Sequence, residues 1–114
     1  MAGAVDISVL NTLKDQLGDS LEKLLQVFLD QVPNQLEDIE SGLKAGDLKA
    51  AMRPAHTLKS SAATLGAFSL SELLKAIEMG ARAGSSEGLV ELLNQAREEF
   101  KSVQASLSVY IQGR

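Results

Sequence analysis

The residue with the clearest chemical potential is His56, the one histidine in a chain of 114 residues. A neutral imidazole carries a free nitrogen lone pair and can act as a nucleophile, for example towards a phosphoryl group. Lys59 follows three residues later, and its ammonium group can offset the negative charge that such a group brings. Ser60 and Ala63 lie one and two helical turns after His56 and are small enough to let another protein approach. The alternative is an exposed histidine with no chemical role.

Other chemistries lack the residues that they require. The chain has no cysteine, which excludes disulfides, thiolate metal sites and cysteine nucleophiles. One histidine cannot supply the two Glu-x-x-His motifs of a di-iron helical bundle, and the sequence has no glycine-rich phosphate loop. The carboxylates are scattered over positions that we expect to face solvent. We therefore predict no metal site and no autonomous enzyme, and a small enzyme using His56 as a general base is the remote alternative.

The elements that must position His56 are helices. Leucine and alanine dominate the apolar residues, and apolar spacing with capping residues divides the chain into five helical segments. We expect these segments after Asp6 to Gly18, from Asp19-Ser20 to Gly46, from Asp47 to Gly66, from a Ser69-x-x-Glu72 capping box to Gly80–Gly84, and from Ser85-Ser86 to about Ile111. Because the connections are short, successive helices should pack antiparallel. The predicted fold is all-α, an antiparallel up-down four-helix bundle with a short extra N-terminal helix.

The third segment should turn His56 away from the core. At about 100° per residue, its apolar positions form one narrow stripe, and His56 falls some 150° from the centre of that stripe. Pro54 removes an amide donor and disfavours helical geometry at Arg53, so we expect a kink just before His56. Pro33 should similarly kink the second segment without breaking its stripe.

Length and composition predict one domain over residues 1–114, with an ordered core of about residues 6–112. The net charge of −4 argues against a nucleic-acid partner, and no apolar run is long enough to cross a membrane. The start of the chain does not resemble a signal peptide, so we expect a cytoplasmic protein. All of the apolar stripes can be buried by packing within one bundle, which predicts a monomer.

The charge is not spread evenly along the chain. Residues 41–71 carry a net charge of +3 and the rest −7, so the positive charge gathers around His56.

The residues from His56 to Ala67, with the sequence HTLKSSAATLGA, resemble the signature of histidine-containing phosphotransfer (HPt) domains. The resemblance extends over nearly the whole chain. It includes the short leading helix, the long helix with an internal proline, the Gly-Asp pair before the helix that carries His56, and the leucine-rich helix ending near Glu78. Ser60 departs from the family pattern, which usually has glycine there.

The resemblance implies a phosphorelay intermediate rather than a kinase. His56 would take a phosphoryl group from a phospho-aspartate of a receiver domain and pass it to an aspartate of another, with Nε2 as the usual reactive atom. Lys59 would stabilise the phosphoryl group, Ser60 and Ala63 would leave access, and Arg53 and Met52 are candidates for receiver docking. The implied partners are response-regulator receiver domains and a sensor or hybrid histidine kinase. No intrinsic cofactor is implied, because the receiver would bring the Mg²⁺.

The main alternative is a non-catalytic helical module whose basic face binds an acidic partner. Family members that have lost the histidine would be of this kind. His56 and Lys59 together argue for phosphoryl transfer in this chain. The cognate kinase and receiver, and the direction of net transfer, stay open at this level.

Overall fold

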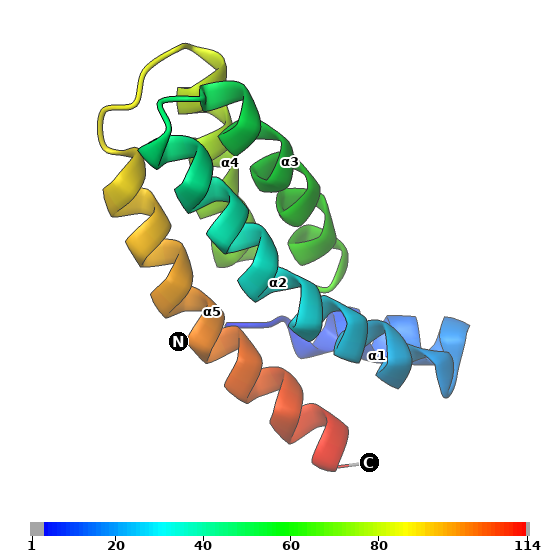
Figure 1. The fold of residues 1–114 in the computed structure, drawn as a ribbon. Helices are drawn as coiled ribbons and strands as arrows, with labels where there is room; N and C mark the ends of the chain where they lie inside the picture. The colour runs from blue at the N-terminus through cyan, green and yellow to red at the C-terminus, as the bar shows by residue number, and fades with distance from the viewer. Residues whose placement is uncertain (1–3, 114) are drawn as a thin grey trace.

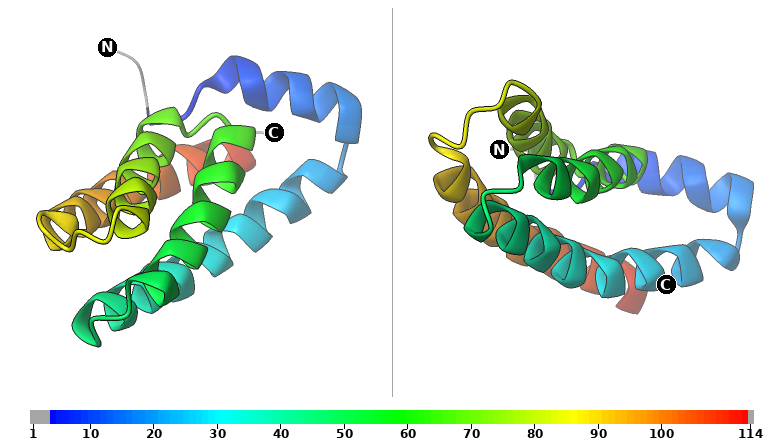
Figure 2. Two further views of the ribbon diagram at one scale, coloured as in Figure 1. Left: turned by 90° about the horizontal axis from the view of Figure 1, so that it is seen from above. Right: turned by 45° about the horizontal axis from the view of Figure 1, so that its top comes forward.

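The computed structural model describes residues 4–113, and these residues form five helices and their connections. The helices are α1 (Ile7–Leu17), α2 (Ser20–Lys44), α3 (Leu48–Thr64), α4 (Phe68–Arg82) and α5 (Leu89–Gln112). Helices α2 to α5 form the antiparallel bundle, in which α3 packs against α2 and α4, and α5 packs against α2 and α4 (Figure 1). Helix α1 runs back along the first half of α2 at one end of the bundle (Figure 2). The predicted fold class is confirmed.

Buried apolar side chains from every helix form one continuous core. Its largest fully buried members are leucines together with Ile39, Ile77 and Val32. Burying a leucine or isoleucine side chain stabilises the fold by about 1.5–3 kcal/mol relative to leaving it exposed. Val5, which precedes α1, also belongs to this core.

Helix α3 is fixed at both ends. At its start, Oδ1 of Asp47 accepts a hydrogen bond from the Ala50 amide at 3.1 Å, which is the predicted N-cap. At its end, Gly66 adopts a positive φ of 85°, and its carbonyl accepts a hydrogen bond from the Asp6 amide at 3.0 Å. The N-terminal segment therefore secures the turn that follows α3. Helices α2 and α3 run without a break through Pro33 and Pro54 respectively.

Two predicted helix starts are wrong. Helix α4 begins at Phe68 with Ala67 as its N-cap and has no side-chain cap, so the Ser69–Glu72 capping box does not form. Helix α5 begins at Leu89, after Gly88 in the left-handed conformation, three to four residues later than the serine pair suggested. In both cases the turn before the helix is set by backbone hydrogen bonds: the Ala67 amide donates to Ala62, and the Ser85 amide donates to Gly80.

Candidate functional site

His56 lies near the middle of α3 on its exposed side, as the helical spacing predicted, with 60% of its side chain accessible to solvent. Its ring reaches across to α4, where Nδ1 lies 2.7 Å from Oε2 of Glu78. Glu78 is almost completely buried, with 3% of its side chain accessible. The imidazole is thus held at one nitrogen by a carboxylate of the neighbouring helix.

Glu78 gathers three nitrogen-bearing side chains. Nζ of Lys59 lies 2.7 Å from Oε1, and a guanidinium nitrogen of Arg82 lies 2.7 Å from Oε2, the oxygen that also contacts His56. The Lys59 ammonium is the main cause that holds the pKa of the Glu78 carboxyl below its ordinary value, and the hydrogen bond from His56 acts in the same direction. Burial alone would raise that pKa. Glu78 is therefore ionised at neutral pH.

The ionised carboxylate determines the tautomer of His56. A carboxylate can only accept hydrogen bonds, so the Nδ1 atom beside it must carry the ring proton. In the neutral ring the free lone pair is then on Nε2. Nε2 has no hydrogen-bond partner among residues 4–113 and faces the exposed side of α3.

The packing of α4 against α3 explains how Glu78 reaches this position. The hydroxyl of Ser71 donates a hydrogen bond to the carbonyl oxygen of Lys59 at 2.9 Å, which fixes the register of the two antiparallel helices. From Ser71, α4 runs back past Lys59 towards His56, so Glu78, two turns later, meets both side chains. Leu74 and Ile77 on the same side of α4 are fully buried.

The prediction that the carboxylates face solvent is wrong for Glu78. The spacing of Glu78 in the sequence does indicate burial, because Glu78 lies four residues after Leu74 and one after Ile77, on the apolar stripe of the helix. Arg82 follows at the i+4 spacing of a helical ion pair. Lys59 is also less free than expected, because its ammonium contacts Glu78 and only 27% of its side chain is accessible.

The other predicted site residues surround His56 without entering this cluster. Ser60 and Ala63 are exposed on α3, as expected. Arg53 is exposed, and Met52 is half-buried beside Lys49 and Arg82 in the groove between the start of α3 and the end of α4. Among residues 4–113, no group of three or more histidine, cysteine, aspartate or glutamate side chains is arranged to hold a metal ion.

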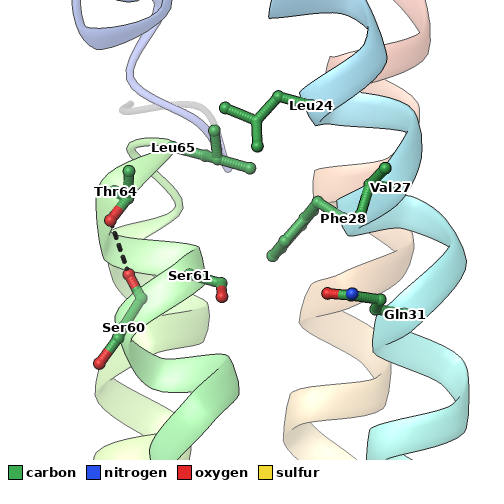
Figure 3. Close-up of a pocket in the computed structure, with 8 residues that line it drawn as sticks. All are labelled: Leu24, Val27, Phe28, Gln31, Ser60, Ser61, Thr64 and Leu65. Atoms are coloured by element: carbon green, nitrogen blue, oxygen red, sulfur yellow. Dashed lines mark hydrogen bonds between the residues drawn. The ribbon is translucent and has the colours of Figure 1, made fainter.

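A second, largely apolar groove of about 230 Å³ lies between α2 and the second half of α3 (Figure 3). It is lined by Leu24, Val27, Phe28, Gln31, Ser60, Ser61, Thr64 and Leu65. The three hydroxyl groups of its α3 wall bond to that helix's own backbone. Ser60, Ser61 and Thr64 donate to the carbonyl oxygens four residues earlier, at 3.4, 3.2 and 2.9 Å. Their hydrogens point to the helix, and each hydroxyl oxygen keeps lone pairs that can accept a hydrogen bond from a partner.

Residues 23–106 match the Hpt domain family. The chain belongs to the Hpt domain family. A solved structure of histidine-containing phosphotransfer protein B (HptB) from Pseudomonas aeruginosa PAO1 is similar over the whole length. The two share 28% sequence identity and a TM-score of 0.94, with 100% of this chain and 99% of that chain covered. A comparison with curated proteins finds no match.

This Hpt domain therefore has a histidine phosphotransfer role in a two-component phosphorelay, and it is a phosphocarrier. Hpt proteins interact with receiver domains and histidine kinases. No helix within residues 4–113 combines the length and the apolar character that crossing a membrane requires.

Proposed function

We propose that Nε2 of His56 is the atom that receives the phosphoryl group from a receiver phospho-aspartate and passes it to another receiver aspartate. The observation that carries this assignment is the 2.7 Å contact between Nδ1 and the ionised Glu78, which leaves the lone pair on the exposed Nε2. His56 is also the only histidine in the sequence. Glu78 acts through His56, as a positioning residue.

The transfer needs no proton to enter or leave this site. The Nε2 lone pair forms the N–P bond while the P–O bond to the aspartate breaks, and the electrons of that bond restore the aspartate carboxylate. Nδ1 keeps its proton throughout, so the phosphorylated ring is a cation beside the Glu78 anion. In the onward step a carboxylate oxygen of the acceptor aspartate forms the new P–O bond, the electrons of the N–P bond return to Nε2, and neutral imidazole is the leaving group. The Mg²⁺ that phosphoryl transfer requires would be bound by the receiver.

Access to Nε2 favours a protein partner of this kind. Ser60 and Ala63 present little bulk next to His56, and the apolar groove between α2 and α3 continues from Ser60. On the other side, Met52, Lys49 and Arg82 line a groove with two cations, and Arg53 is exposed nearby on α3. Under this proposal the receiver docks over both grooves, with His56 between them. A leucine at Ala63 should slow transfer from a receiver without unfolding the bundle.

The proposal includes the absence of autonomous kinase activity, an intrinsic cofactor and a nucleic-acid partner, together with a monomeric state. The sequence-based prediction of a cytoplasmic location stays a prediction. The absence of kinase activity is tested by incubating the pure protein with ATP and Mg²⁺ alone. The monomeric state is tested by measuring the mass of the protein in solution. Labelling by ATP without a kinase would contradict the phosphocarrier assignment.

The direct test uses a phosphorylated receiver domain or an active hybrid kinase as the donor. We expect wild-type protein to acquire phosphate that is acid-labile and alkali-stable, and His56→Gln to acquire none. Lys59→Ala should be labelled more slowly. Absence of label on the wild type with a range of donors would favour the non-catalytic interaction module, and full labelling of His56→Gln would place the chemistry elsewhere.

A further inference from the structure

The carboxylate of Glu78 has two permanent cations, and the transfer role accounts for only one of them. Lys59 contacts Oε1, whereas Arg82 contacts Oε2. Lys59 lies on the same helix as His56 and is the cation that can follow the phosphoryl group. Arg82 lies on α4, four residues after Glu78, with 66% of its side chain accessible. Besides lining the groove at the start of α3, Arg82 contributes to the charge balance of the cluster.

The charges change when Nε2 is phosphorylated. With the His56 ring in the neutral form that transfer requires, ionised Glu78, Lys59 and Arg82 together carry one excess positive charge. The phosphoryl group adds roughly two negative charges and the ring becomes a cation, so the phosphorylated cluster is close to neutral. Without Arg82, the same cluster would start neutral and end with a negative charge. Because the carboxylate at the centre of this cluster is buried, an uncompensated negative charge beside it is unfavourable.

We propose that Arg82 is a positioning residue that keeps Glu78 on Nδ1 of His56 while the Lys59 ammonium moves from Glu78 to the phosphoryl group. This inference rests on the proposed role of His56. Lysine suits the moving part, because its ammonium is a point charge on a flexible four-carbon stem. Arginine suits the fixed part, because its guanidinium bonds to the oxygen that Lys59 does not use, so the departure of Lys59 leaves this contact in place.

The contacts support this exchange in two ways. Arg82 and Glu78 share helix α4, so their pair does not depend on the position of α3. Arg82 also lies 2.7 Å from the Glu78 carboxylate, as Lys59 does, so a cation stays on the carboxylate when Lys59 leaves.

The test uses phosphoramidate as the phosphoryl donor, because a small molecule has no docking surface. Phosphorylation of His56 and the half-life of the phosphohistidine are measured at neutral pH in wild type, Arg82→Ala and Arg82→Lys. We expect Arg82→Ala to be labelled about three-fold more slowly, which is the effect expected for one exposed ion pair. Arg82→Lys should recover most of the rate. In a Lys59→Ala background, Arg82→Ala should have a larger effect than in wild type, because Arg82 is then the one lysine or arginine left on Glu78 among residues 4–113.

The matched control is Lys75→Ala. Lys75 is an exposed cation seven residues before Arg82 on the same edge of α4 and makes no contact with Glu78. It should be labelled like the wild type. The inference is overturned if Arg82→Ala and wild type are labelled equally by phosphoramidate and differ only with a receiver donor, since Arg82 then serves docking. It is also overturned if the effects of Lys59→Ala and Arg82→Ala simply multiply. Absence of label on wild type with either donor would instead reject the proposed role of His56.

Discussion

Under the proposed role of His56, one buried residue on a different helix determines which ring nitrogen is free to react. Glu78 accepts the Nδ1 proton, and this single contact settles the tautomer, the orientation of the ring and the exposure of Nε2. A histidine on an exposed helix face without such a partner would rotate and share its proton between both nitrogens. The distinction between a reactive histidine and an ordinary surface histidine therefore lies in Glu78.

Glu78→Gln should show a pH-dependent loss of stability. The pKa of Glu78 is lowered in the folded protein from an ordinary value of 4.5, so ionised Glu78 stabilises the fold above that pH. This stabilisation should disappear as the pH falls below 4.5 and through the lower folded value. We expect wild type to melt at a higher temperature than Glu78→Gln at pH 6, and the two melting temperatures to converge towards pH 3. Glu98→Gln, at an exposed pair with Lys101, should melt like the wild type. A difference that grows on acidification would contradict this account.

Ser60→Gly should preserve or raise the rate of phosphoryl transfer. The Ser60 hydroxyl donates a long hydrogen bond of 3.4 Å to the His56 carbonyl oxygen, so it has no evident role at the ring. Glycine at an exposed helix position should cost about 0.5 kcal/mol of stability. Transfer rates and thermal unfolding are compared with Ser60→Ala, which removes only the hydroxyl. A large loss of transfer in both variants would show that the hydroxyl is required.

At the scale of helices, the sequence predicted features within one helix better than the points where a connection ends and a helix begins. Apolar spacing and the cap at Asp47 predicted α3 and the outward position of His56 correctly, because both depend on residues within one helix. The starts of α4 and α5 were missed, because backbone hydrogen bonds from the preceding turns define them. The Lys59–Glu78 contact joins residues on two helices, and its register depends on packing that no single helix encodes.

Gly42→Ala and Gly80→Ala should affect stability differently, although both glycines are helical. A Cβ at Gly42 would lie 2.7 Å from the backbone nitrogen of Ala51, where α2 and α3 approach closely, and neither backbone can yield easily. We expect a loss of about 1–3 kcal/mol. A Cβ at Gly80 would meet a terminal methyl of Leu89 at 2.7 Å, which can rotate away, so we expect a much smaller change. Urea unfolding measures both, and equal losses would show that the α2–α3 approach is not the tighter one.

At the scale of the molecule, charge is divided between the transfer side and the rest. The net charge of +3 over residues 41–71 predicted this division, but two of its cations are paired with carboxylates just outside that segment. Lys44 contacts Glu40, and Lys59 contacts Glu78. Lys49 and Arg53 are both exposed on α3, and with Arg82 of α4 they would be available to a partner that approaches His56.

Charge reversal on α3 should slow transfer from a receiver more than it slows labelling by phosphoramidate. Lys49→Glu combined with Arg53→Glu removes the attraction to an acidic partner, and we expect a loss of roughly ten-fold or more in the association rate at low salt. The difference from wild type should shrink as ionic strength rises. Lys101→Glu serves as the control, because α5 does not contact α3 within residues 4–113. Equal slowing with both donors would place the effect at the reacting groups.

The hydroxyl-lined wall of the groove beside His56 has a consequence for signalling fidelity. With Ser60, Ser61 and Thr64 bonded to their own helix, this surface offers an approaching protein apolar area and hydroxyl oxygens that can only accept hydrogen bonds. Under the proposed docking, it would favour a receiver that brings apolar side chains or hydrogen-bond donors. Exposed Leu24 and Gln31, on the α2 side of the groove, would contribute to the same selection. The residues that recognise a receiver would then differ from His56 and Glu78, so one set could diverge while the other is preserved.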